Sequence, residues 1–170
     1  ISTIAEREAE QTGKTVVIVG LGRIGQRLAR FCKAFDMHGI GVKRDTSSGR
    51  EGVDELVATG ELARVLARAD TVVLACPLTA ETTGLIGADA LKAMKPTAHL
   101  VNVARGKVVD EAALIAALQA KALRAAALDV TVEEPLPSAS PLWAMPNVLI
   151  TPHTAGETQA YEDNVIDILI

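Results

Sequence analysis

Three polar residues in the second half of the chain have the types that proton transfer on an anionic substrate requires. Arg105, Glu134 and His153 each lie within a few residues of the end of a short apolar run. Arginine binds carboxylates through paired hydrogen bonds, histidine exchanges a proton near neutral pH, and a carboxylate orients that histidine and stabilises its charged form. Taken singly, they have ordinary explanations as an ion pair, a solvated loop charge and a loop histidine. The catalytic interpretation therefore requires a fold that brings them together.

The apolar pattern predicts such a fold. Six runs have the length and composition of strands: Val16–Val19, Gly39–Val42, Thr71–Ala75, His99–Val103, Ala125–Val130 and Val148–Ile150. Segments of helical periodicity lie between them, at Ile24–Phe35, Asp54–Ala69, Ala88–Met94 and Glu111–Ala122. Wholly apolar strands that alternate with helices indicate an α/β fold with a doubly wound parallel sheet of the Rossmann type. Ligands of such sheets bind beyond the carboxyl ends of the strands, where the three polar residues are expected.

A glycine-rich turn follows the first predicted strand. Its sequence is Gly20-Leu21-Gly22-Arg23-Ile24-Gly25, and it opens a helix that carries Ile24, Leu28, Phe31 and Phe35 on one side. Gly20 permits a tight turn, Gly22 lets the backbone approach a pyrophosphate, and Gly25 lets the helix pack closely on the strand. The helix N-terminus supplies amide donors to the phosphates. The context predicts a dinucleotide site, with a purely structural turn or a methyl-donor site as alternatives.

The end of the second predicted strand bears on which dinucleotide is bound. An acidic side chain there accepts hydrogen bonds from the ribose 2′-hydroxyl of NAD, whereas a basic one accommodates the 2′-phosphate of NADP. This chain has Lys43 and Arg44 before Asp45. We therefore expect NADP, with NAD as the alternative if Lys43 and Arg44 are only solvated loop charges.

Composition limits the other classes of function. The 170 residues suit one domain, and the net charge of -4 without a dense basic run argues against nucleic acid as a partner. No apolar run is long enough to span a membrane, so we expect a cytoplasmic protein in which Cys32 and Cys76 are free thiols. The cysteines and histidines lack metal-ligand spacing, and His38 and His99 fall at the wrong ends of their strands for catalysis.

Several longer motifs resemble the NAD-binding domain of the D-isomer-specific 2-hydroxyacid dehydrogenases, the group that contains phosphoglycerate dehydrogenase and glyoxylate/hydroxypyruvate reductase. The motifs are Val19–Gly25, Cys76–Thr79, Val101–Gly106 with Val109–Glu111, Ala127–Val130 with Glu134–Leu136, and Pro146–Val148 through Pro152–Gly156. Their order is that of the family, with 29 residues from Arg105 to Glu134 and 19 from Glu134 to His153. The resemblance covers nearly the whole chain.

The resemblance implies an oxidoreductase that reduces a 2-keto acid to a D-2-hydroxy acid. Arg105 would bind the substrate, His153 would act as acid and base, and Glu134 would hydrogen-bond to His153. The other implied cofactor contacts are Arg23 and Ile24 at the pyrophosphate, Cys76, Pro77 and Thr82 at the ribose and adenine, Val103 and Arg105 at the nicotinamide, Asp129 at its carboxamide, and Ala104, His153, Ala155 and Gly156 nearby. Lys43 replaces the Asp of NAD-specific members, and Glu134 replaces the Gln of formate dehydrogenases.

The resemblance also implies an organisation. Family members are roughly double this length, so residues 1–12 are expected to form a flanking helix at a domain or dimer boundary. Residues 13–155 would form the dinucleotide-binding domain, and residues 156–170 a helix leading toward a substrate domain outside this chain. We expect a homodimer, and a 170-residue chain that binds dinucleotide but turns over little 2-keto acid. A dinucleotide-sensing corepressor-like module is the alternative, whereas a methyltransferase would leave Arg105, Glu134 and His153 unexplained.

Overall fold

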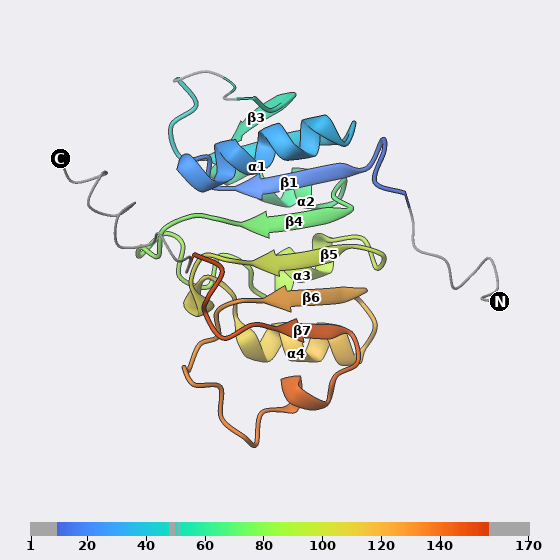
Figure 1. The fold of residues 1–170 in the computed structure, drawn as a ribbon, viewed down its shortest axis with the longest axis vertical. Helices are drawn as coiled ribbons and strands as arrows, with labels where there is room; N and C mark the ends of the chain where they lie inside the picture. The colour runs from blue at the N-terminus through green and yellow to red at the C-terminus, as the bar shows by residue number, and fades with distance from the viewer. Residues whose placement is uncertain (1–9, 48–49, 51, 157–170) are drawn as a thin grey trace.

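A computed structural model describes residues 10–47, 50 and 52–156 (Figure 1). Its centre is one parallel sheet of seven strands in the order β3-β2-β1-β4-β5-β6-β7. The strands are β1 (Thr15–Val19), β2 (His38–Lys43), β3 (Glu55–Ala58), β4 (Thr71–Leu74), β5 (His99–Asn102), β6 (Ala125–Leu128) and β7 (Val148–Ile150). The doubly wound α/β prediction is confirmed.

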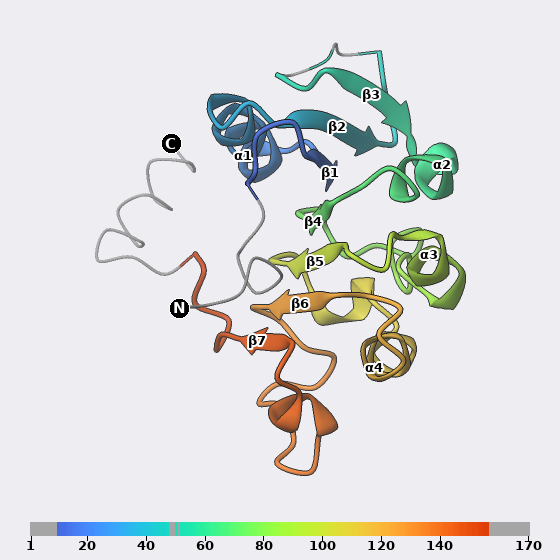
Figure 2. The ribbon, with the colours of Figure 1, turned by 90° about the vertical axis from the view of Figure 1, so that its right-hand side faces the viewer.

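The helices lie on both faces of the sheet, and Figure 2 shows α1 on one face with α2, α3 and α4 stacked on the other. They are α1 (Arg23–Ala34), α2 (Leu62–Leu66), α3 (Ala88–Ala93) and α4 (Glu111–Gln119), with 3-10 turns η2 (Thr59–Glu61), η3 (Gly106–Val108) and η4 (Pro141–Ala144). The larger core lies under α2, α3 and α4 and is made of aliphatic side chains such as Leu66, Leu100 and Leu114. A smaller core under α1 contains Ile18 and Ala29.

One predicted element is wrong. The sequence predicts a helix over residues 54–69, but Glu55–Ala58 form the edge strand β3 and the helix is only Leu62–Leu66. Leu56 and Val57 pair with β2 instead, where one face of the short strand remains partly exposed. Four residues are too few to display the alternation that identifies a strand. Glu55 then forms ion pairs with Arg64 and Arg68, which connect β3 to the helical segment that follows.

The carboxyl ends of the parallel strands meet at one edge of the sheet, toward which the arrows of β1, β4, β5, β6 and β7 point in Figure 1. His38 and His99 begin β2 and β5 and therefore lie at the opposite edge, as predicted. Cys32 and Cys76 are free and buried, which was also expected. Within the described part of the chain, no helix is both long and apolar enough to cross a membrane.

Candidate active site

The three glycines of the turn between β1 and α1 differ in their surroundings: two pack against backbone atoms, and one borders open space. Gly20 has a φ of 96°, and a Cβ there would lie 2.7 Å from backbone atoms of Cys76. A Cβ on Gly25 would overlap the carbonyl oxygen of Gly20. A Cβ on Gly22, by contrast, would meet no atom within 4 Å. Gly20 and Gly25 are thus required by packing, whereas Gly22 faces space that a phosphate could approach, at the N-terminus of the 12-residue helix α1.

A cavity of about 450 Å³ extends from this turn toward the end of β2. It brings together seven of the residues predicted to contact the cofactor: Gly20, Gly22, Lys43, Arg44, Cys76, Pro77 and Thr82. Asp45 does not line this cavity, and its carboxylate accepts a hydrogen bond from the Ser47 amide at 2.9 Å. Two basic side chains therefore lie where an acidic side chain that accepts hydrogen bonds from the ribose 2′-hydroxyl would be expected.

The loop after β4 forms the other wall of this cavity. The Thr82 hydroxyl donates to the Pro77 carbonyl at 2.7 Å and accepts from the Thr79 amide at 2.7 Å. Thr82 therefore fixes the loop's shape as well as lining the cavity. Glu81 also lines it, and a hydrogen bond from the Thr79 hydroxyl lowers the pKa of Glu81. Burial raises the pKa of the Cys76 thiol, which favours its neutral form.

A second cleft, of about 880 Å³, lies between the start of α1 and the ends of β5, β6 and β7. Its lining contains seven predicted site residues: Ile24, Val103, Arg105, Asp129, His153, Ala155 and Gly156. Four further predicted residues, Arg23, Gly25, Ala104 and Glu134, line neither cavity. Gly25 and Ala104 are buried, and Arg23 is exposed at the first position of α1.

Glu134 and His153 are in direct contact. The Nδ1 atom of His153 lies 2.8 Å from Oε2 of Glu134, and the Thr131 amide donates to Oε1 at 3.0 Å. The hydrogen bond with His153 lowers the pKa of Glu134, burial opposes this, and the Thr131 amide and the charge of Arg105 add to it. An ionised carboxylate only accepts hydrogen bonds, so Nδ1 carries the proton of this contact. The Nε2 atom is then the one left for a substrate.

Asp129 holds the loop that carries His153. The backbone of His153 has a φ of 58°, a left-handed conformation that costs a residue other than glycine about 1 kcal/mol or more. The buried Asp129 carboxylate accepts from the amides of Thr154 at 3.1 Å and Ala155 at 3.1 Å, and from the Thr151 hydroxyl. Burial opposes its ionisation, but these hydrogen bonds outweigh burial and lower the pKa of Asp129.

A comparable arrangement shapes the loop of Arg105. The buried Asn102 side chain accepts from the Ala104 amide at 3.0 Å and donates to the Arg105 carbonyl at 3.1 Å. Gly106 packs against the backbone of Thr131 so closely that a Cβ would overlap its carbonyl group. No role could be assigned to Asn102, Gly106 or Thr151 from the sequence. The available signal was a polar residue that ends an apolar strand, followed soon by glycine.

These features define a dinucleotide-binding Rossmann domain with a histidine–carboxylate pair beside its glycine turn. Residues 3–155 match the family model described as "D-isomer specific 2-hydroxyacid dehydrogenase, NAD binding domain". The chain belongs to this family, and its cofactor is NAD(P).

Known relatives give the same family. The chain is 48% identical to a glyoxylate reductase of Pyrococcus furiosus over 150 residues, which cover 88% of this chain and 44% of that protein. It is 40% identical to a D-3-phosphoglycerate dehydrogenase of Archaeoglobus fulgidus over 157 residues, with 92% of this chain and 29% of that protein covered. A D-isomer specific 2-hydroxyacid dehydrogenase of Xanthobacter autotrophicus, solved with NADPH and MES, superposes with a TM-score of 0.83 at 40% identity, covering 92% of this chain and 65% of that one. The chain spans less than half the length of these two curated relatives.

Proposed function

We propose that this chain is the cofactor-binding half of an enzyme that interconverts a 2-keto acid and a D-2-hydroxy acid. The observation that carries the proposal is the 2.8 Å contact between His153 and Glu134 at the cleft that Arg105 also lines. Glyoxylate and hydroxypyruvate are the substrates we favour, since a relative 48% identical to this chain is named glyoxylate reductase.

The chain's own residues account for the proton transfer and for the binding of the substrate carboxylate. A nicotinamide, when bound, supplies the hydride that reduces C2 of the keto acid. His153 in its protonated form donates a proton from Nε2 to the carbonyl oxygen, and the ionised Glu134 stabilises that protonated form. Arg105 binds the substrate carboxylate and keeps the carbonyl near His153. In the oxidative direction, neutral His153 takes the proton of the hydroxyl group.

The cofactor we propose is NADP(H) rather than NAD(H). Lys43 and Arg44 line the cavity next to the glycine turn, and the carboxylate of Asp45 is bonded to its own loop. Two cations at this position favour a 2′-phosphate over a 2′-hydroxyl.

A two-part experiment tests the reaction. The 170-residue chain should bind NADPH in a calorimetric titration yet reduce little or no glyoxylate, because the relatives are more than twice as long as the matched region. The full-length enzyme that contains this domain should oxidise NADPH with glyoxylate or hydroxypyruvate in a steady-state assay. Substantial turnover by the 170-residue chain would contradict the proposal that this chain is only the cofactor-binding half of the enzyme. No turnover of any 2-keto acid by the full-length enzyme would contradict the proposed reaction.

Two further expectations belong to the same proposal. The family resemblance implies a homodimer, and the buried free thiols Cys32 and Cys76 suit the reducing conditions of a cytoplasmic location. Light scattering of the purified protein and fractionation of the source cells test them.

A further inference from the structure

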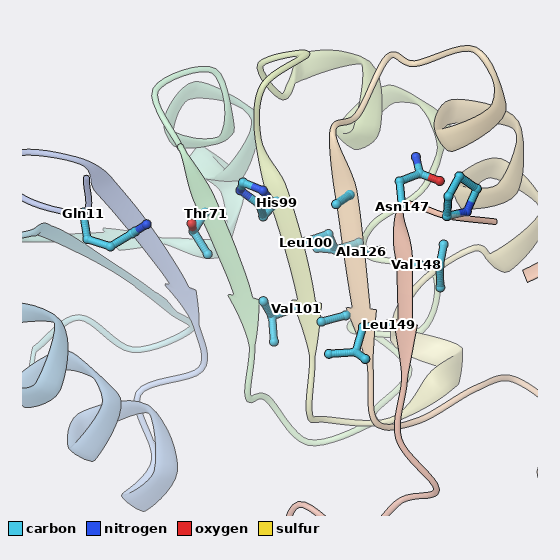
Figure 3. Close-up of a pocket in the computed structure, with 12 residues that line it drawn as sticks. Gln11, Thr71, His99, Leu100, Val101, Ala126, Asn147, Val148 and Leu149 are labelled. Carbon is cyan, nitrogen blue, oxygen red and sulfur yellow. The ribbon is translucent and has the colours of Figure 1, made fainter. Parts of the chain in front are cut away.

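One face of the sheet holds a cavity that offers few groups for chemistry. It has a volume of about 620 Å³ and lies over β5, β6 and β7 (Figure 3). Among its described lining residues only His99 can titrate, and none carries a fixed charge. The carboxylates of Glu111, Asp129 and Glu134 lie instead at the carboxyl edge, where each accepts a hydrogen bond from loop backbone. The carboxyl edge is therefore where a further side chain could influence proton transfer.

Glu134 depends on a short loop for its orientation. Strand β6 ends at Leu128, and Glu134 follows six residues later. Within this loop the Thr131 hydroxyl donates to the Glu133 carbonyl at 2.7 Å. The Glu134 side chain is 38% exposed. Ordering a long, partly exposed side chain costs conformational entropy, so contacts that fix the loop favour the bond between Glu134 and His153.

Two successive amides of this loop bind two different carboxylates. The Thr131 amide donates to Oε1 of Glu134 at 3.0 Å, and the Val132 amide donates to Oε2 of Glu111 at 3.1 Å. Hydrogen bonds to ionised acceptors are stronger than those between neutral groups. Because the two amides belong to adjacent peptide units, a backbone movement that broke the Val132 bond would also displace the Thr131 amide. The position of Glu134 is therefore linked to Glu111.

Glu111 reaches the loop from a helix. It is the first residue of α4 and lies 21 residues before Val132 in the chain. The N-cap of α4 is Asp110, which already accepts a hydrogen bond from an amide of the first turn. The buried side chains of Leu114 and Leu118 hold α4 in the main core. The bond from Val132 to Glu111 therefore connects the loop to a helix that the core keeps in place.

We propose that Glu111 is a positioning residue for the reaction. By holding the Val132 amide, it keeps the Glu134 carboxylate where Oε2 accepts a hydrogen bond from Nδ1 of His153 at 2.8 Å. That contact selects one neutral tautomer of His153 and leaves Nε2 for the substrate. The catalytic consequence rests on the function proposed above, whereas the effect on the contact between His153 and Glu134 does not.

The tautomer of His153 tests the proposal without any turnover. At about pH 8.5 histidine side chains are largely neutral, and the ¹⁵N chemical shifts of the ring show which nitrogen carries the proton. In the 170-residue chain His153 should be mainly in the Nδ1–H form. Glu111→Ala should raise the population of the Nε2–H form about threefold or more, within what one hydrogen bond contributes. His153→Gln assigns the signals, which separates them from those of His38 and His99.

Two control variants separate positioning from stability. Glu111→Gln keeps an acceptor oxygen of the same reach, so it should retain the Nδ1–H form. Asp110→Ala removes the cap of α4 and should lower the Tm, but the Asp110 side chain bonds within its own helix, so the tautomer should not change. The proposal is overturned if His153 is not mainly Nδ1–H in the unaltered chain, if Glu111→Ala leaves its tautomer unchanged, or if Asp110→Ala shifts it equally.

Steady-state kinetics of the full-length enzyme test the catalytic consequence. Glu111→Ala should lower kcat for glyoxylate reduction about threefold or more. The Kd for NADPH should not change, because Glu111 lines neither of the two cofactor-side cavities. The loss of kcat should be larger at about pH 8 than at about pH 6, since protonated His153 is scarcer at the higher pH and then depends most on Glu134. The other charged groups that face His153, Asp129 and Arg105, remain in place.

The kinetic outcomes distinguish the positioning role from the reaction itself. Glu111→Gln should restore kcat to within about twofold of the unaltered enzyme. A loss of kcat in Glu111→Ala that is equal at both pH values and is shared by Asp110→Ala would reflect stability alone and would overturn the positioning role. If no form of the enzyme turns over a 2-keto acid while the His153 tautomer shifts as expected, the proposed reaction fails and the role of Glu111 in holding Glu134 stands.

Discussion

Gly106 packs directly against the carbonyl group of Thr131. This contact joins the loop after β5, which carries Arg105, to the loop after β6, where the Thr131 amide holds the carboxylate of Glu134. The two charged residues therefore have a common backbone support. A side chain at position 106 would separate them.

Gly106→Ala should destabilise the domain. Its methyl group would overlap backbone atoms of Thr131, which have no side-chain freedom to move aside, and overpacking of this kind costs about 1–3 kcal/mol. Thermal denaturation should show a lower Tm than for Gly60→Ala, a control position where a Cβ meets no atom within 4 Å. Equal Tm values for the two variants would contradict the contact.

Gly22→Ala should separate ligand binding from folding. A Cβ at Gly22 meets no protein atom, and its φ of -73° is accessible to alanine, so the Tm should not fall. If a pyrophosphate approaches this backbone, the methyl group should raise the Kd for NADPH about tenfold or more, a loss of about 1.4 kcal/mol. Gly25→Ala should instead lower the Tm, because its Cβ overlaps Gly20. Unchanged NADPH affinity for Gly22→Ala would exclude this binding mode.

The sequence was sufficient for features set by local pattern. All six predicted strands begin within one residue of their observed starts, and β1 runs into the glycine turn as expected. The missed strand β3 is defined by its pairing with β2, which four residues cannot reveal on their own. Likewise, Ile24, Phe31 and Phe35 could be assigned to one side of a helix, but their exposure depends on which elements cover α1.

The supports of the site could not be predicted for a similar reason. Gly106 contacts Thr131 and Asp129 binds Thr151, each pair being more than twenty residues apart in the chain. Such contacts follow from how the loops close over the sheet edge and leave no local spacing to recognise. Asp129 was expected only at the cofactor carboxamide, and its bonds to the His153 loop appear only in three dimensions.

Asp129→Asn should loosen the catalytic loop and change how stability depends on pH. The variant loses a charged acceptor of at least three hydrogen bonds, which should cost about 1–3 kcal/mol. The pKa of Asp129 is lower in the folded than in the unfolded state, so its contribution is complete above the unfolded value of about 3.9 and is lost as pH falls through the folded value.

Urea denaturation at several pH values measures this effect. The stability difference between the unaltered chain and Asp129→Asn should be constant from pH 6 to pH 8 and shrink below about pH 4. Asp36→Asn, which changes an exposed carboxylate, should follow the unaltered chain. If the stability difference between the unaltered chain and Asp129→Asn grew on acidification, the ionised Asp129 carboxylate would not be the stabilising form.

His153→Gln in the full-length enzyme should lower kcat for glyoxylate reduction by about a hundredfold or more, since general acid catalysis commonly contributes that much. Glu134→Gln should also lower kcat, because a neutral amide stabilises protonated His153 less than a carboxylate does. NADPH affinity should be largely retained in Glu134→Gln, which lines neither of the two cofactor-side cavities. A near-normal kcat for His153→Gln would remove it from the acid role.

Arg44→Ser should change cofactor preference. Arg44 lines the cavity beside the glycine turn, and a guanidinium group there would pair with the 2′-phosphate that only NADP carries. The Kd for NADPH should rise about tenfold, as expected when one such charged hydrogen-bonded contact of 1.4 kcal/mol is lost, while the Kd for NADH should stay within about twofold. Arg27→Ser, which removes an exposed arginine of α1 outside that cavity, serves as the control. If the unaltered chain binds NADH more tightly than NADPH, or if Arg44→Ser weakens both equally, then Lys43 and Arg44 are solvated loop charges and the cofactor is NAD.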